Sequence, residues 1–333
     1  MASLTKSNTW YVVVNVFAAS STAMSRWDIA RARLDADGVS YEAVFTGLDG
    51  NATELTAAAA AKGYRQFIAV GGDGTLHDVL QGIMSCVGDS DISGQLIKIS
   101  DFTLGVIPLG SGNDWIKTYG IPRDIQQAAS LFTHGMISRQ DIVRVSMLDQ
   151  DSNVREVRYM ANVGGVGLDA RVCVKVNRAK REGKKGKILY VLALLDCILH
   201  RDPASAYVIC DGRKAYEGGF LSISFGIGKY SGGGMRQTPD AVVDDGLLDM
   251  TLIPDLPLLK IAKEAPKLFN GKLLNVPEVV TSRARTIEVI PIEGAVEGGE
   301  PVEVDGEVVG NSPVRFEILE NQLNIIVPHR STL

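Results

Sequence analysis

Apolar runs alternate with segments of helical apolar spacing over the first part of the chain. The runs that predict buried strands are Trp10–Phe17, Tyr41–Phe45, Gln66–Val70 and Phe102–Ile107. Asn51 and Asp124 are favourable N-cap residues and predict the starts of two of the intervening helices. Strands that alternate with helices at this spacing predict a parallel sheet, and ligands bind such sheets beyond the carboxyl ends of the strands.

After residue 134 the pattern changes to β-like runs separated by turn residues. The predicted strands are Ile142–Met147, Val154–Val163, Ala206–Cys210, Phe220–Ile227, Leu247–Ile253, Ala284–Ile290, Val302–Val304 and Val314–Leu319. Two apolar helices, Lys187–Leu199 and Leu258–Phe269, interrupt them. This pattern is typical of a mainly antiparallel β domain beside an α/β domain.

We therefore expect the fold class α/β plus β. An α/β nucleotide-binding domain would span residues 1–134, with a C-terminal tail of about residues 315–333 packed back on it. A β-sandwich domain for the substrate would span residues 135–314, with the active site in the cleft between the two.

Composition excludes several classes of protein. The formal net charge of −5 and the pI near 5.5 do not favour a nucleic-acid binder. Four cysteines without a Cys-x-x-Cys pair indicate reduced thiols in a cytoplasmic setting. The longest apolar run, Ile188–Leu199, contains Asp196 and is too short to span a bilayer. We expect a cytoplasmic protein that is soluble or at most peripheral to a membrane.

One segment reverses the overall charge. Between Arg171 and Lys187, eight basic residues face a single acid, Glu182; they are Arg171, Lys175, Arg178, Lys180, Arg181, Lys184, Lys185 and Lys187. The run adjoins an apolar segment and could contact anionic lipid or the phosphates of a nucleotide. A solvated helix face is the alternative, and both stay open.

A glycine-rich junction follows the third predicted strand, with the sequence Gly71-Gly72-Asp73-Gly74-Thr75. Backbone N–H groups at a helix N-terminus favour a phosphate. Because the Asp73 carboxylate would repel that phosphate, the pattern predicts either phosphate with Mg²⁺ or a site for a hydroxyl that loses its proton. The alternative is a plain glycine turn in which Asp73 caps a helix.

A second segment, Pro108-Leu109-Gly110-Ser111-Gly112-Asn113-Asp114, follows the next strand, so that the two segments would share one crevice. No Gly-x-x-x-x-Gly-Lys-Ser/Thr is present, His77 replaces the third glycine of a dinucleotide fingerprint, and the protein-kinase signatures are absent. Phosphate binding here must use another arrangement.

Two further motifs follow these segments in the chain. They are Gly232-Gly233-Gly234-Met235 and Asp244-Asp245-Gly246-Leu247-Leu248-Asp249. Together the four motifs resemble the diacylglycerol kinase catalytic-domain superfamily. Its members include bacterial soluble lipid kinases and sphingosine kinases, and NAD kinases are remoter relatives. The resemblance implies an NAD-kinase-like nucleotide domain.

The resemblance also implies roles for individual residues. An ATP site would be lined by Asn15, Thr46, Gly71, Gly72, Asp73, Gly74, Thr75, Leu76, His77, Asp78 and Ser111. Asp73 and Asp114 would organise Mg²⁺ and the charges around the transferred group. Glu307, in a Val304-Asp305-Gly306-Glu307 segment, would be the general base; a hairpin turn with a solvated acid is its alternative.

A separate Mg²⁺ site would use the Asp245 side chain with the backbone carbonyls of Val242 and Leu247. Two departures from the family pattern stand out. After the first strand only Asn15 is kept of the family's Asn-Pro-x-Ser-Gly loop. The stretch Thr75-Leu76-His77-Asp78 stands where bacterial relatives often have Asn-Glu, and we expect His77 on the helix surface rather than in catalysis.

The sequence thus predicts a kinase that transfers the γ-phosphate of ATP, with Mg²⁺, to a hydroxyl of a diacylglycerol-like or sphingoid lipid at a membrane surface. The alternatives are an NAD kinase-like enzyme and a non-catalytic lipid- or nucleotide-binding relative, which the altered Asn15 loop motivates. The oligomeric state stays open, with a homodimer as one alternative.

Overall fold

The computed structural model describes residues 8–18, 22–47, 51–91, 94–110, 112–182, 187–200, 204–292, 299–319 and 322–329. The chain divides into two compact units. The first comprises Met1–Ile142 with Glu320–Leu333, and the second comprises Val143–Leu319. Each unit is described by itself below.

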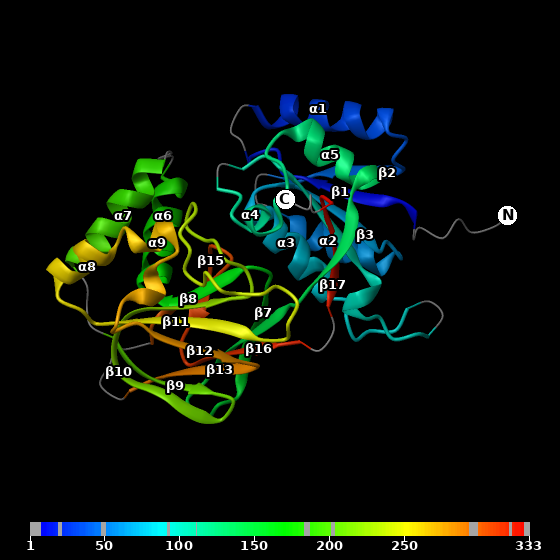
Figure 1. Cartoon of the computed structure of the whole chain (residues 1–333). Coiled ribbons are helices and arrows are strands. Elements are labelled where there is room, and N and C mark those ends of the chain that lie inside the picture. The colour runs from blue at the N-terminus through cyan, green and yellow to red at the C-terminus, as the bar shows by residue number, and fades with distance from the viewer. Residues whose placement is uncertain are drawn as a thin grey trace. The chain divides into compact units, whose positions relative to one another are not determined.

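The first unit is built on a six-stranded sheet (Figure 1). In spatial order its strands are β2 (Tyr41–Phe45), β1 (Trp10–Val14), β3 (Gln66–Gly71), β4 (Thr103–Pro108), β17 (Leu323–Val327) and β5 (Met136–Gln140). The pairs from β2 through β17 are parallel, and β5 pairs antiparallel with β17. The predicted parallel sheet is confirmed, and β1, β3 and β4 are almost completely buried.

Helices cover both faces of this sheet. They are α1 (Ala23–Ala36), α2 (Ala52–Ala61), α3 (Asp73–Met84), α4 (Trp115–Tyr119) and α5 (Ile125–His134), with a short 3₁₀ turn at Ile99–Asp101. Helix α1 packs with α5 and α2 packs with α3, and Figure 1 shows these pairs on opposite faces of the sheet.

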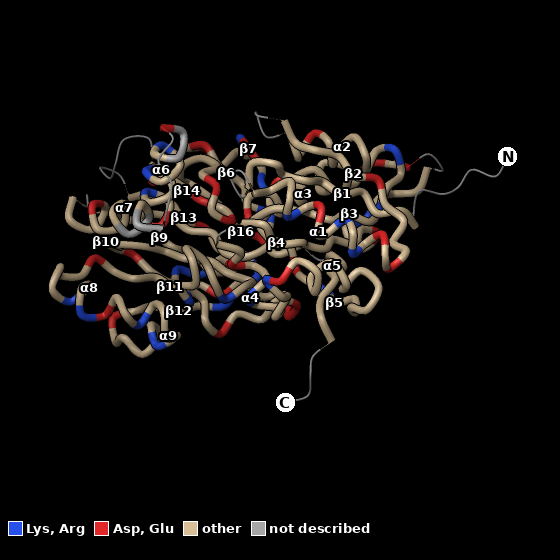
Figure 2. The backbone as a smooth tube through the Cα atoms, turned by 90° about the horizontal axis from the view of Figure 1, so that it is seen from above, with Lys and Arg blue, Asp and Glu red and all other residues tan. Residues whose placement is uncertain are grey.

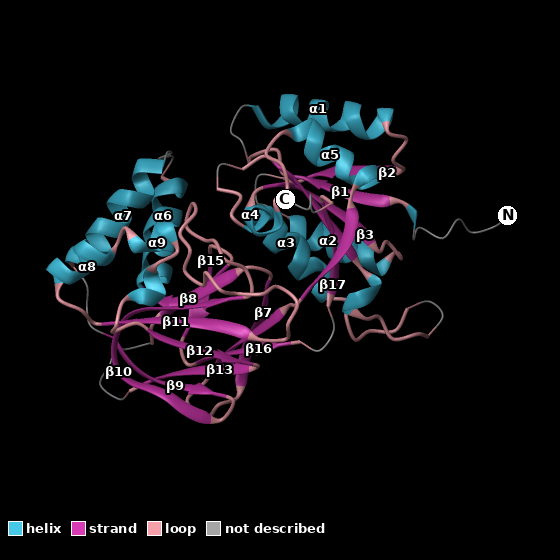
Figure 3. Ribbon diagram, in the orientation of Figure 1, coloured by secondary structure: helices cyan, strands magenta, loops and turns pink. Residues whose placement is uncertain are grey.

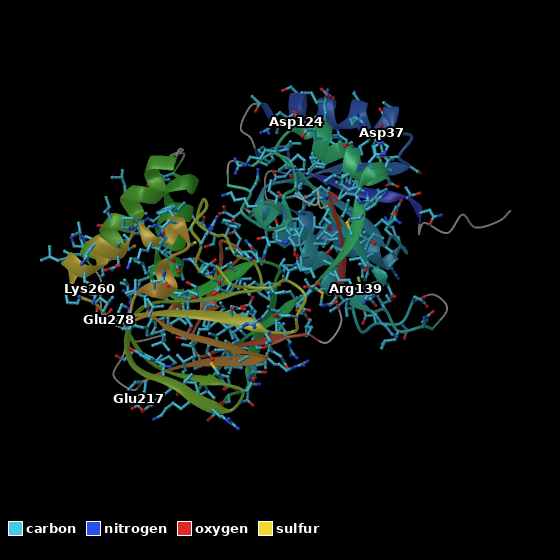
Figure 4. The ribbon with its side chains drawn as sticks, viewed as in Figure 1. Asp37, Asp124, Arg139, Glu217, Lys260 and Glu278 are labelled. Atoms are coloured by element: carbon cyan, nitrogen blue, oxygen red, sulfur yellow. The ribbon has the colours of Figure 1, made fainter. Side chains whose placement is uncertain are left out.

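The two predicted N-caps have different outcomes. Asp124 caps α5 as expected, since its carboxylate accepts the Gln127 amide at 2.9 Å; Figure 4 labels its position. Asn51 precedes α2 but does not cap it, because its side-chain oxygen accepts the amide of Gly47 instead.

The first unit extends through Ile142, whereas the sequence placed the boundary at residue 134. Strand β5 lies between these two positions and pairs along its length with β17. Its membership in the first sheet therefore depends on a strand that comes almost two hundred residues later in the chain.

The second unit contains an antiparallel sheet of eleven strands in the part of the chain that the structure describes. Nine of them follow the order β15 (Glu307–Asn311), β14 (Pro301–Val304), β8 (Val163–Gly167), β10 (Arg213–Gly226), β9 (Ala204–Cys210), β13 (Thr286–Pro291), β16 (Val314–Ile318), β6 (Val143–Leu148) and β7 (Val154–Met160). β11 (Leu248–Pro254) pairs with β10 and with β12 (Val280–Ala284).

The long strand β10 makes this sheet fold onto itself. Its first half pairs with β9, and its second half pairs with β8 and β11. The two parts meet face to face, with the ring of Phe225 on β10 stacked on Phe316 of β16 at 4.2 Å between centroids. Both rings are fully buried, so the expected β-sandwich-like domain is confirmed.

Helices of the second unit pack together beside the strands, as Figure 3 shows. They are α6 (Leu168–Arg181), α7 (Lys187–Leu199), α8 (Leu258–Glu264) and α9 (Lys267–Asn270), with a 3₁₀ turn at Leu273–Asn275. The predicted single helix over 258–269 is wrong, because α8 ends before Pro266, which cannot continue it. Lys260 on α8 forms an ion pair with Glu278 ahead of β12 (Figure 4).

A small apolar core joins three of these helices through Val172, Cys197 and Ile261, of α6, α7 and α8 respectively. Among the described residues, no helix combines the length and the apolar character that crossing a bilayer requires.

Candidate functional site

The junction of β3 and α3 forms the first part of the candidate site. Strand β3 ends at Gly71 and α3 starts at Asp73, with Gly72 as the N-cap in an extended conformation. The first N–H groups of a helix have no acceptor within the helix. They carry its partial positive charge, so the junction directs donors toward the carboxyl edge of the sheet.

A second loop, after β4, makes close backbone contacts with this junction. The Leu109 amide donates to the Gly71 carbonyl at 2.7 Å. A Cβ atom at Gly110 would lie 2.7 Å from the Cα of Gly72, and a side chain cannot be accommodated at that distance. The two loops can therefore approach this closely only because both positions are glycine, and the Asn113 side chain lies beside them, with its Oδ1 2.8 Å from the same Cβ position.

Asp73 ties the two loops together. Its carboxylate oxygens accept the backbone amides of Asp114 at 3.0 Å and Trp115 at 3.2 Å. Asp73 thus caps a helix, but the helix is α4 rather than its own α3. The Asp114 carboxylate in turn forms an ion pair with Lys117.

The end of β1 joins the same edge through Asn15. Its side-chain amide donates to the Thr75 hydroxyl at 3.0 Å, and its oxygen accepts the Phe17 amide at 2.9 Å. At the end of β2, the Thr46 hydroxyl is buried without a hydrogen-bond partner among the described residues. An unpaired buried hydroxyl costs free energy, which a bound polar ligand would recover.

Four more of the residues predicted to contact the nucleotide lie in the first turns of α3. They are Gly74, Leu76, His77 and Asp78. Leu76 and His77 are buried, at 2% and 4% exposure, because α3 packs against both the sheet and α2. The expectation of a surface His77 is therefore wrong. Ser111 lies outside the described residues.

Two arginines at this edge were missed by sequence reasoning. Arg26 on α1 donates to the carbonyls of Leu109 at 2.7 Å and Pro108 at 3.4 Å. Arg123 donates to the Gly112 carbonyl at 2.6 Å. Neither arginine belongs to a glycine motif. The one sequence feature that could have indicated them is a basic residue near the start of a helix that follows a candidate phosphate loop.

The second unit places Glu307 on a tight hairpin. Asp305 and Gly306 form the turn with φ of 53° and 90°, and Glu307 pairs with Val304 across it. The Asp305 carboxylate accepts the amides of Ala161 and Asn162, each at 2.9 Å. These hydrogen bonds fix the turn to a neighbouring segment. Glu307 follows the turn directly, and its side chain is exposed.

A buried pair of acids lies under this hairpin. Glu303 is 4% exposed and accepts the Gly306 amide at 2.8 Å. Asp169 on α6 accepts the hydroxyls of Ser222 at 2.7 Å and Ser224 at 3.1 Å, both on β10.

The two acids differ in the donors they receive. Burial raises the pKa of Glu303 well above its ordinary value, and the nearby Asp169 charge raises it further. Burial also raises the pKa of Asp169, but hydrogen bonds from Ser222, Ser224 and Gln237 act in the opposite direction. Fewer hydrogen bonds therefore oppose the effect of burial on the pKa of Glu303 than on that of Asp169.

The predicted separate metal site lies in the turn that leads into β11, and it stays a prediction. The Asp245 carboxylate accepts the Leu247 amide at 3.1 Å and forms an ion pair with Arg283. Asp245 is the one carboxylate of the predicted set, since Val242 and Leu247 would contribute backbone carbonyls. Within the described residues, no cluster of three or more His, Cys, Asp or Glu side chains could hold a metal ion.

Comparison with known protein families matches most of the chain. Residues 9–145 match the model of the diacylglycerol kinase catalytic domain, and residues 162–327 match the YegS C-terminal NAD kinase beta sandwich-like domain. The boundary between the two matches falls near the boundary between the two units.

Curated relatives match over nearly their whole length. A diacylglycerol kinase of Mycobacterium tuberculosis is 29% identical over 301 residues, which are 90% of this chain and 88% of that protein. A probable lipid kinase YegS-like protein of Xanthomonas euvesicatoria is 27% identical over 292 residues, covering 87% and 88% of the two chains.

Solved structures share the fold. The crystal structure of a diacylglycerol kinase from Bacillus anthracis aligns with a TM-score of 0.67 and covers 97% of each chain. At 20% identity this similarity concerns the fold alone.

Replacing Asp73 with Asn should destabilise the protein by about 1–3 kcal/mol, because an amide has one acceptor oxygen where two backbone amides need one each. Urea unfolding would measure the loss. Asp124→Asn is the matched control, since Asn caps a helix as well as Asp does. Equal stability of the two variants would show that the Asp73 carboxylate does not hold the loops.

Replacing Glu303 with Gln should raise the melting temperature by a few degrees at about pH 8 and by less at about pH 5. A carboxyl group whose pKa is raised in the folded protein destabilises that protein increasingly as the pH rises above its unfolded pKa of about 4.3. The amide of Gln does not titrate, so the variant avoids this loss of stability. Glu317→Gln, on a partly exposed side chain of β16, is the control. A gain that does not depend on pH would contradict a raised pKa of Glu303.

Proposed function

The chain belongs to the diacylglycerol kinase catalytic-domain superfamily, and on that premise we propose that it is an ATP- and Mg²⁺-dependent lipid kinase. The acceptor would be a hydroxyl of a diacylglycerol-like or sphingoid lipid. The observation that carries the proposal is the backbone contact of Gly72 with Gly110 at the start of α3, because glycine loops at a helix N-terminus offer backbone N–H donors that suit phosphate.

The residues of the first unit fit a nucleotide. Main-chain donors at the start of α3 would bind phosphate oxygens, and the buried hydroxyl of Thr46 would gain the partner that it lacks. Asn15 and Thr75, already hydrogen-bonded to each other, would extend the polar wall at the end of β1.

The carboxylates of the first unit suit a metal that arrives with the nucleotide. Mg²⁺ is usually held by one or two carboxylates together with substrate phosphates, rather than by a cage of protein ligands. Asp114 and Asp73 would serve it in this way, with Asp73 acting mainly through the loops that it holds. When bound, the ion would neutralise charge on the transferred group.

Glu307 would act as the general base of the transfer. The lipid hydroxyl oxygen forms a bond to the γ-phosphorus while the bond from that phosphorus to the bridging oxygen of ADP breaks. The hydroxyl proton passes to the Glu307 carboxylate. The hairpin suits this role because Asp305 and Glu303 fix its turn from both sides.

We propose the helices α6 and α7 as the contact with the membrane. Leu192, Leu195 and Leu199 recur on one face of α7 and are 51–61% exposed. Of the basic run, Lys175 pairs with Asp196, and Arg171 and Arg178 also have acidic partners; Figure 2 shows the basic and acidic positions along the backbone.

The contact with anionic lipid therefore depends on the later basic residues. Lys184 and Lys185 lie outside the described residues, and Lys187 begins α7. The apolar face of α7 would enter the interface, and these lysines would approach the lipid head groups.

Transfer of labelled phosphate from ATP to a panel of diacylglycerol, ceramide and sphingosine, with NAD in parallel, tests the proposed function. We expect label on a lipid and none on NAD. Transfer to NAD would identify an NAD kinase-like enzyme. ATP binding without transfer to any acceptor would identify a non-catalytic relative.

The control for this assay is Glu307→Gln, which should lower kcat by about 10²–10⁴-fold because the amide cannot accept the proton. Glu217→Gln, on the surface of β10 (Figure 4), should leave kcat unchanged. If Glu307→Gln keeps full turnover, Glu307 is not the base, although the chain could still be a lipid kinase.

Changing Lys184, Lys185 and Lys187 together to Glu should weaken binding to anionic vesicles by roughly a hundredfold or more, since each basic residue near such a surface contributes about 1 kcal/mol. Vesicle co-sedimentation measures the binding. The matched charge reversal of Arg31, Lys62 and Lys98, exposed in the first unit, should have little effect. Unchanged binding of the first variant would rule out this contact.

A further inference from the structure

An arginine occupies the acidic turn where the family resemblance implies a second metal. Arg283 on β12 lies directly across from Asp249 on β11, and its Nε donates to the Asp249 carboxylate at 3.3 Å. One Nη of the same guanidinium pairs with the carboxylate of Asp245, in the turn that leads into β11. A single cation therefore joins the turn to two strands.

Both carboxylate oxygens of Asp245 have protein partners. One accepts the Leu247 amide at 3.1 Å and the other pairs with Arg283. Mg²⁺ requires about six oxygen ligands at about 2.1 Å, and the Asp245 oxygen that pairs with Arg283 could serve it only if the guanidinium moved away. The guanidinium would also repel the ion at this distance.

The charges around the turn are balanced by Arg283. Its guanidinium lies within ion-pair distance of the carboxylates of both Asp245 and Asp249. A guanidinium stays charged at every physiological pH and offers several donors in one plane, so it can serve both carboxylates at once.

We propose that Arg283 is the resident cation of this turn and takes the place of a divalent metal at Asp245. The turn of residues 240–247 then folds without Mg²⁺. Any requirement for Mg²⁺ would arise from the nucleotide alone. This proposal does not rest on the proposed lipid kinase function, because it concerns the stability of the protein without substrate.

Melting curves of the whole chain without nucleotide, in excess MgCl₂ and in EDTA, test the proposal. The natural protein should melt at the same temperature in both. Arg283→Met should melt roughly 2–4 °C lower in EDTA, and Mg²⁺ should restore part of the loss by taking the vacated position. Arg285→Met, on an exposed arginine two residues along the chain, is the matched control and should change little.

A second substitution assigns the effect to Asp245. The double variant Asp245→Asn with Arg283→Met should lose the restoration by Mg²⁺. The proposal is overturned if Mg²⁺ stabilises the natural protein and Asp245→Asn abolishes that gain, since the metal then binds beside Arg283. It is also overturned if Arg283→Met melts at the same temperature as Arg285→Met, or if Mg²⁺ does not raise the melting temperature of Arg283→Met. Should Arg283→Met fail to fold, the MgCl₂ titration of the natural protein decides alone.

Discussion

The contact between the Asp73 carboxylate and the amides of Asp114 and Trp115 is the constraint on which the candidate site depends. The two glycine loops follow adjacent parallel strands, and strand pairing alone brings their first residues together. Beyond the strand ends hydrogen bonds help to hold them together, and the carboxylate accepts two of these. The backbone contact of Gly72 with Gly110 is then possible because neither residue carries a side chain. A carboxylate beside the proposed phosphate site thus has a structural role, because it holds the two loops together and accepts the amides of a helix N-terminus.

The second unit uses buried acids in a similar way. Asp305 fixes the hairpin by accepting two amides, and Glu303 accepts a third inside the turn. Glu303 is held in a setting that disfavours its charge, which costs stability at neutral pH. Such a cost is common where a site needs a fixed geometry that a more stable core would not provide. Arg283 shows the opposite solution, in which the charges of a turn are neutralised within the protein itself.

The sequence predicted the parallel sheet, the β-sandwich-like unit and the glycine loops, because apolar periodicity and glycine placement are local properties of the chain. It failed where a residue's partner comes from a distant segment. His77 looked like a surface residue because α2, which covers its helix, is not visible in the spacing of α3. The ion pair of Asp245 with Arg283 could not be foreseen, since 38 residues and a strand pairing separate them. Arg26 was missed because its partners are carbonyl groups, which leave no mark in a sequence.

The position of β17 has a consequence for how the protein is made. This strand lies between β4 and β5, so the first sheet has a gap until residues 323–327 are available. During synthesis the ribosome must therefore complete the entire second unit before the first can close its sheet. Until then the edge of β4 exposes unpaired hydrogen-bonding groups, which are a template for pairing with other chains. The nascent protein thus carries its first unit as an unfinished intermediate until residues 323–327 are made, and this is the period in which chaperones would have the most to protect.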